Sequence, residues 1–126
     1  EIKGLETFER FSYKRFGTGS WVIDTTRPDH IASVALAYEA VIAALDQDHD
    51  ILIVDEILYA VQMKLLDEDK VLELMKLAKD KKQELILTGS HEALPKVFEL
   101  ADLVTEIKKI KHPYDKGIIA RPGIEY

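Results

Sequence analysis

Apolar side chains recur at helical spacing in the stretch that follows Pro28. They stand three or four residues apart, which predicts an amphipathic helix packed on a core. The residues concerned are Ile31, Val34, Ala35, Tyr38, Val41, Ile42 and Leu45. Residues 25–29, at the predicted start of this helix, contain a hydroxyl side chain for the N-cap, a proline for the first turn and an acid near the positive end of the helix dipole. The helix is expected to end within residues 46–50.

A second helix is predicted after Asp67, which we expect to cap it. Its inward-facing positions are Val71, Leu72, Met75 and Ala78. The lysine-rich stretch 79–82 favours a C-terminal end there, because cations stabilise the negative end of the helix dipole. A short third helix is predicted over residues 94–101, with Pro95 in its first turn.

Other segments read as strands. Ile51–Val54 and Leu85–Leu87 are unbroken aliphatic runs, which are typical of strands buried on both faces of a parallel sheet. Residues 9–16 are rich in alternating aromatics, and residues 103–110 also have strand character, so both predict further strands. The tail from His112 onward contains prolines and glycines and is expected to be a loop.

This alternation of strands and helices predicts an α/β fold. Short links between parallel strands and helices imply right-handed crossovers and a mostly parallel sheet flanked by helices. The sequence contains no internal repeat, low-complexity tract or interdomain linker. Residues 1–126 are therefore expected to form a single α/β domain.

Composition narrows the function classes. The chain is 47% hydrophobic and 32% charged, which is ordinary for a globular protein. Its net charge of -6 argues against binding nucleic acid through bulk electrostatics. No run of apolar residues is long enough to predict a membrane span. The absence of cysteine excludes disulfides and thiolate metal sites and suits a cytoplasmic protein.

Asp55 and Glu56 directly follow the aliphatic run 51–54. This is the Walker-B pattern, in which a buried strand delivers carboxylates to the sheet edge where ligands bind in open α/β folds. Oxygen ligands suit Mg²⁺, so Asp55 is predicted to bind it directly or through water, with Glu56 joining the shell or orienting water or nucleotide. The alternative is a buried strand followed by a solvated acidic turn without a ligand.

Thr88, Gly89 and Ser90 end the next aliphatic run. Parallel strands place this turn at the same sheet edge as Asp55. Two hydroxyls and a glycine that permits close approach could hydrogen-bond a phosphate or a ribose. The alternative is a plain strand-to-helix turn.

The last quarter of the chain has an order of residues that periodicity does not require. Leu100–Glu106, Lys111–Asp115 and Gly117–Tyr126 resemble the C-terminal signature of the P-loop ATP:corrinoid adenosyltransferases. The resemblance extends back through Thr88–Gly89, the Asp55 strand and the turn at residues 17–21 to Gly4 and Leu5, and so covers most of the chain. It implies a P-loop NTPase-like (RecA-like) core and the substrates ATP with Mg²⁺ and a corrinoid. It also implies a homodimer.

The family's reaction transfers the 5′-deoxyadenosyl group from ATP to cobalt(I) of a corrinoid and releases triphosphate. Cobalt(I) is the nucleophile, so the resemblance assigns no catalytic side chain. The protein positions two reactants and neutralises the leaving group. The family's phosphate loop does most of that neutralisation, yet no G-x-x-x-x-G-K-[ST] motif occurs in these 126 residues.

Three further site residues follow from the resemblance. Trp21 matches a tryptophan implied to lie beside the corrin ring, although the family's neighbouring phenylalanine is absent. Ser90 stands where the family usually has arginine, which removes a charged phosphate contact. His112 is assigned to the cofactor-binding set through hydrogen bonding or packing. A cobalt-ligating role is not expected, because cobalt(I) must lack a strong axial ligand. His30, His49 and His91 are expected to be surface or cap residues.

The sequence therefore predicts an ATP:corrinoid adenosyltransferase whose N-terminal phosphate-loop segment lies outside this chain, which begins at Glu1. The chain alone is expected to be nearly inactive. Two alternatives remain open. One is a non-catalytic module that keeps corrinoid binding or dimer contacts, and the other is a fragment of a different P-loop ATPase.

Overall fold

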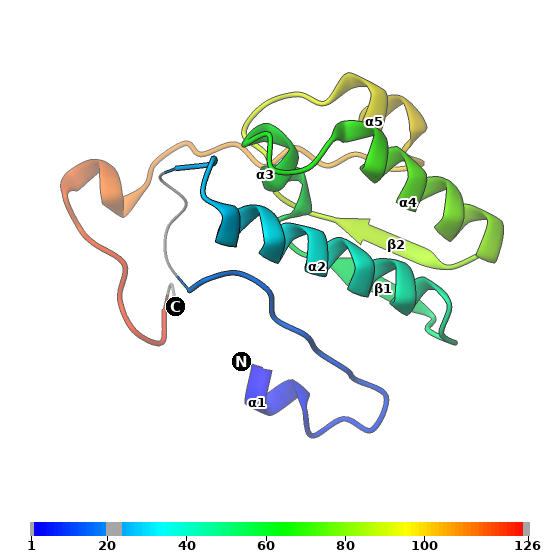
Figure 1. Cartoon of the computed structure of the whole chain (residues 1–126). Coiled ribbons are helices and arrows are strands. Elements are labelled where there is room, and N and C mark those ends of the chain that lie inside the picture. The colour runs from blue at the N-terminus through cyan, green and yellow to red at the C-terminus, as the bar shows by residue number, and fades with distance from the viewer. Residues whose placement is uncertain (1, 20–23, 125–126) are drawn as a thin grey trace.

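The computed structural model describes residues 2–19 and 24–124. Helices and strands follow one another in the order shown in Figure 1. They are α1 (Ile2–Leu5), α2 (Pro28–Leu45), β1 (Ile51–Val54), α3 (Ile57–Gln62), α4 (Glu68–Lys81), β2 (Glu84–Leu87), α5 (Pro95–Leu100) and the 3-10 helix η1 (Pro113–Lys116). The structure is α/β, as predicted.

The sheet of the described residues has two parallel strands, which confirms the predicted parallel pairing. β1 and β2 pair in register from Ile51 opposite Glu84 to Val54 opposite Leu87. The connection between them carries α3 and α4, and α4 packs on β2 while α2 packs on β1. α2 and α4 also contact each other, so they form one layer over the sheet (Figure 1).

The two faces of the sheet differ sharply. Leu52, Val54, Leu85 and Leu87 are partly buried and pack against the core beneath the helices. Ile51, Ile53 and Ile86 point the other way, because strand side chains alternate, and they are 56%, 61% and 45% exposed. The prediction that these strands are buried on both faces was therefore wrong for the described residues. We call the uncovered side the bare face of the sheet.

The core lies between the helix layer and the covered face. Its fully buried side chains, Val71 and Leu74, come from α4, and Leu45 of α2 is 2% exposed. Ile57 and Leu58 of α3 complete it at the strand ends. The sequence did not predict α3, because this helix is short and starts directly after the strand-end acids without a capping side chain.

The predicted helices are present, but their caps differ from expectation. Arg27 occupies the N-cap of α2 without a side-chain hydrogen bond, and the nearby Thr26 hydroxyl donates to Asp24 Oδ1 instead. Asp67 is the N-cap of α4, as predicted, yet its carboxylate makes no cap hydrogen bond. Length and mean hydropathy alone would let α2 span a membrane, a weak test that core helices of soluble proteins also pass.

The strands predicted at residues 9–16 and 103–110 are absent. Both segments lack regular secondary structure from residue 11 and residue 103 onward, respectively. Alternation predicts that a segment suits a sheet, but a strand also needs a neighbour whose backbone groups face its own. No neighbouring strand lies beside either segment within the described residues. Figure 1 shows the chain after α5 as an extended trace that passes behind α4 and α3 in this view before it reaches η1.

Candidate functional site

The carboxyl ends of β1 and β2 are tied together by one hydroxyl group. Thr88 Oγ1 donates a hydrogen bond to Asp55 Oδ1 at 2.6 Å and accepts one from the Glu56 backbone N–H at 2.9 Å. The Thr88 carbonyl accepts from the Leu58 N–H at 3.1 Å. We call residues 55–59 together with Thr88 and Gly89 the strand-end junction. It holds the Asp55 carboxylate in a fixed orientation at the sheet edge.

Gly89 allows the two turns of the junction to touch. Its φ of +99° lies in the left-handed region, and a Cβ atom there would stand 3.0 Å from the Tyr59 nitrogen and 3.2 Å from the Glu56 Cα. Glu56 itself has a φ of 64°, which is costly for a residue with a side chain. Backbone strain of this kind often marks functional sites. The close approach that Gly89 permits in this structure is to protein backbone, and an approach of phosphate or ribose to it stays a prediction.

Ser90 is engaged in a local turn. Its hydroxyl donates to the Glu92 carbonyl at 2.6 Å and accepts from the Glu92 N–H at 3.1 Å, and its φ is 75°. The next residue, His91, contacts the Tyr59 ring edge-on, and its N–H donates to Gln62 Oε1. These contacts fasten the turn after β2 to α3. A phosphate or ribose contact by Ser90 stays a prediction.

The donor set at the junction fits magnesium. Asp55 and Glu56 are exposed carboxylates at one strand end, and the Thr88 hydroxyl is engaged with Asp55 and the Glu56 N–H. Among residues 2–19 and 24–124 no group of three or more histidine, cysteine or acidic side chains could enclose a metal. Mg²⁺ does not need such a cage, because it is commonly bound by one or two carboxylates together with substrate phosphates.

Two predicted site residues lie elsewhere. Trp21 falls outside the described residues. His112 lies in the exposed tail, where its Nδ1 accepts a hydrogen bond from the Tyr114 N–H at 3.1 Å and caps η1. The adjacent Asp115 pairs with Lys109 at 2.8 Å, and this hydrogen bond holds the pKa of the Asp115 carboxyl below its usual value. The hydrogen-bonding role expected for His112 is therefore a local one in this structure.

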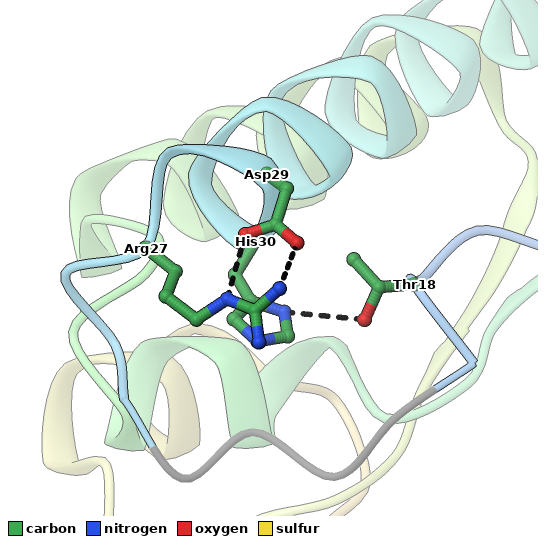
Figure 2. A network of polar contacts seen from close by, with 4 residues as sticks. All are labelled: Thr18, Arg27, Asp29 and His30. Atoms are coloured by element: carbon green, nitrogen blue, oxygen red, sulfur yellow. Dashed lines mark hydrogen bonds and ion pairs between the residues drawn. The ribbon is translucent and has the colours of Figure 1, made fainter.

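The sequence missed a second cluster, at the start of α2. His30 was expected to be a surface or cap residue, but it is buried, with 4% of its area exposed. Its Nδ1 lies 3.4 Å from Thr18 Oγ1 (Figure 2). Ser33 Oγ accepts from the Gly17 N–H at 2.9 Å. The available signal was that position 30 stands four residues before Val34 and eight before Tyr38, on the same helix face.

Comparison with known proteins identifies the relatives of this chain. The family model described as ATP:corrinoid adenosyltransferase BtuR/CobO/CobP matches residues 1–126. A corrinoid adenosyltransferase of Pseudomonas aeruginosa is 32% identical over 94% of the chain and 58% of its own length. One from Sinorhizobium is 36% identical over 64% of the chain and 37% of its own length. The corrinoid adenosyltransferase CobA of Salmonella typhimurium is 28% identical over 85% of the chain and 54% of its own length.

The chain spans 58% or less of the length of each of these relatives. The match nonetheless includes the strand-end junction, the start of α2 and the tail. Each candidate site residue therefore lies in the part of the chain that is similar to corrinoid adenosyltransferases.

Proposed function

Because this chain belongs to the ATP:corrinoid adenosyltransferase family, we propose that it forms the magnesium- and corrinoid-binding part of such an enzyme. The complete enzyme transfers the 5′-deoxyadenosyl group of ATP to cobalt(I) of a corrinoid and releases triphosphate. The observation that carries the proposal is the strand-end junction, in which Thr88 orients the Asp55 carboxylate at the edge where ligands bind in open α/β sheets.

Asp55 and Glu56 hold Mg²⁺ in this proposal. The metal, when bound, neutralises charge that builds up on the departing triphosphate. The hydrogen bond from Thr88 keeps one oxygen of Asp55 occupied and so fixes the carboxylate plane. Gly89 lets the turn after β2 lie against the Glu56 backbone, because it has no side chain to separate the two turns. Ser90 contacts the nucleotide by hydrogen bonding without a positive charge.

The corrinoid is bound in this proposal through Trp21 and the tail, the two parts of the chain in which the family resemblance implies contacts with it. Trp21 packs beside the corrin ring and keeps the lower axial position of cobalt empty, so that the metal remains nucleophilic. His112 stays hydrogen-bonded within η1 and shapes the tail; it is not a cobalt ligand. In this reaction the protein positions ATP and the corrinoid and neutralises the charge of the leaving triphosphate. The proposal therefore needs no side chain that acts as a general base.

The remaining requirement is a phosphate loop. We propose that the complete protein supplies it from a segment outside residues 1–126, and that this segment completes a RecA-like core of which this chain is one α/β domain portion. The bare face of the sheet supports this, because Ile51, Ile53 and Ile86 lack cover among the described residues. The complete enzyme is expected to be soluble, cytoplasmic and homodimeric, and the chain alone nearly inactive.

The test uses the protein made from its native gene, whose intact mass also reveals any further segment. Reduced corrinoid and ATP are mixed with Mg²⁺, and formation of the adenosylated product is followed by its visible spectrum. Asp55→Asn should lower kcat/KM at least about tenfold, or ~1.4 kcal/mol, with partial recovery at high Mg²⁺. Asp80→Asn, at an exposed acid of α4 outside both the strand-end junction and the tail, serves as the matched control and should retain activity.

The outcomes separate the proposed enzyme from its alternatives. An inactive complete protein that binds corrinoid but not ATP would identify a non-catalytic corrinoid-binding module. ATP hydrolysis stimulated by nucleic acid would instead identify a different P-loop ATPase. Full activity in Asp55→Asn would remove the metal assignment while leaving the reaction intact.

A further inference from the structure

Left-handed backbone conformations concentrate in the two turns that follow β1 and β2. Among the described residues, four that are not glycine have a positive φ: Glu56, Lys64, Lys82 and Ser90. Lys64 and Lys82 directly follow the ends of α3 and α4, where a left-handed residue commonly terminates a helix. No helix ends at Glu56 or Ser90, so their conformation has no such explanation. Strain kept in both turns of one sheet edge points to a function for that edge.

His91 follows Ser90, and its main chain is fixed on both sides. Its own N–H donates to Gln62 Oε1 at 2.8 Å, while the Ser90 hydroxyl bonds the N–H and the carbonyl of Glu92. The imidazole ring stands perpendicular to the ring of Tyr59 on α3, at 89° and with 5.3 Å between the two centroids. The ring is therefore held against α3 although His91 as a whole is exposed.

The ring nitrogens of His91 are not used by the protein. Within residues 2–19 and 24–124, neither Nδ1 nor Nε2 of this ring makes a hydrogen bond. Each of the other histidines brings a ring nitrogen within hydrogen-bonding distance of another residue: His30, His49 and His112. An imidazole carries at least one N–H donor in its neutral and in its protonated form. His91 thus presents an oriented donor to a ligand at this edge.

The charges around this donor are otherwise negative. The segments that form the two turns and α3, residues 55–63 and 88–94, contain three carboxylates, and His91 is their only side chain that can carry a positive charge. The next lysine after β2, Lys96, pairs with two acids of α4 at 3.6 Å. Phosphate oxygens are bound by N–H donors as well as by metal ions. A polyphosphate at this edge would therefore find its N–H side-chain donor in His91.

We propose that His91 is a phosphate-binding residue, whose imidazole N–H donates a hydrogen bond to an oxygen of the triphosphate of ATP, and that Tyr59 positions its ring. The identity of the nucleotide rests on the proposed function, whereas the binding of a polyphosphate by His91 does not. A phosphate contact fits better than a contact with the base, because two perpendicular rings form no parallel slot in which a base could stack. His91 then adds a donor to the charge neutralisation that Mg²⁺ provides.

Binding to the complete protein is measured by calorimetry at a fixed Mg²⁺ concentration with three probes: tripolyphosphate, ATP, and adenosine, which has no phosphate. His91→Phe keeps a ring beside Tyr59 and removes the donor, so it should weaken binding of tripolyphosphate and of ATP about tenfold. Binding of adenosine should stay unchanged. His91→Gln keeps an N–H donor and should lose less, about threefold.

Two further substitutions test the role of Tyr59, and one serves as the control. Tyr59→Leu removes the ring that orients His91 and should weaken tripolyphosphate binding about threefold, whereas Tyr59→Phe keeps the ring and should restore the parent affinity. His49→Phe makes the same change as His91→Phe just before β1, at the opposite end of the strand. It should bind all three probes as the parent protein does.

The inference is overturned if His91→Phe binds tripolyphosphate as tightly as the parent protein, or if the parent protein binds no tripolyphosphate. It is also overturned if His91→Phe weakens adenosine and spares tripolyphosphate, because that result assigns the ring to the base. Should His91→Phe fold poorly by far-UV circular dichroism, His91→Ala carries the same test. A parent protein that binds tripolyphosphate through His91 but forms no adenosylated corrinoid would reject the proposed function and keep the inference.

Discussion

The strand-end junction and the C-terminal tail, residues 102–124, are opposites in how they are held. In the junction a single hydroxyl, that of Thr88, bridges two turns, and Gly89 has no space for even one added carbon. In the tail, Leu103 and Ile107 are 84% and 93% exposed, and Gly117 has open space around it. Yet the tail carries the most specific part of the resemblance to corrinoid adenosyltransferases.

The junction contains residues that stabilise the fold of this chain, whereas the tail contains residues that mark its similarity to one protein family. Packing within the described residues accounts for the junction, because Thr88 and Gly89 contact residues 55–59, about thirty positions earlier in the sequence. The tail makes contacts such as His112 with Tyr114 and Lys109 with Asp115, which span a few residues. We infer that the order of residues in the tail is set by a substrate or by further parts of the complete protein.

The largest expected effect on stability comes from comparing a buried apolar side chain of the core with an exposed one of the tail. Leu74 is fully buried, so Leu74→Ala should lower the free energy of unfolding by about 3–5 kcal/mol, through lost burial and the cavity left behind. Ile107→Ala should leave it within about 0.5 kcal/mol. Urea unfolding followed by circular dichroism measures both. An equal loss in the two variants would show that the tail packs on the core in solution.

The second test uses two glycines with positive φ. Gly89→Ala should cost about 2–3 kcal/mol, since the new Cβ meets backbone atoms of Tyr59 and Glu56 in addition to the strained φ. Gly117→Ala, with a φ of +75° and open surroundings, should cost about 1 kcal/mol from conformation alone. Thermal unfolding of the two variants gives the comparison. Equal costs would mean that the junction is less tight than described.

The third test removes one hydrogen-bonding group from each region. Thr88→Val deletes the hydroxyl that serves Asp55 and the Glu56 N–H, and should destabilise the fold by about 1–2 kcal/mol. Thr88→Ser should restore most of this loss. His112→Ala removes the cap of η1 and should leave the urea midpoint unchanged, because the tail does not support the core. A shifted midpoint in His112→Ala would contradict the contrast.

The smallest effect is a pH dependence. Burial and the hydrogen bond to Glu73 raise the pKa of Tyr38 from 10.0 to about 12. The folded state then keeps a proton that the unfolded state loses, so stability should fall as the pH rises from about 10 to 12. Tyr38→Phe should flatten this decline. In the tail, Lys109 lowers the pKa of Asp115, and Asp115→Asn should leave the alkaline limb of the profile unchanged.

The helices could be predicted from sequence because their evidence is local. The spacing that ends at Leu45 and the one that starts after Asp67 describe a single face of a single segment, and both helices lie where expected. Strands depend on neighbours that the pattern does not reveal. Residues 103–110 have the character of a strand, but no strand lies beside them among the described residues, and they stay irregular.

The candidate site could also be predicted only in part. Parallel strands end at one edge of a sheet, so the sequence predicts that Asp55 and Thr88 lie near each other, and in the structure they form a hydrogen bond. The left-handed backbone of Glu56 and the short helix after it left no signature in the sequence. His30 was missed because a histidine on a helix reads as a surface residue, and its burial depends on a turn more than ten residues away in the chain.

The bare face of the sheet has a consequence for handling the chain in solution. Three isoleucines, Ile51, Ile53 and Ile86, face water beside strand edges that lack pairing partners among the described residues. Exposed apolar strands of this kind template association between copies. The net charge of -6 opposes it through mutual repulsion, which salt screens. The colloidal stability of this chain will therefore decrease with ionic strength and with protein concentration.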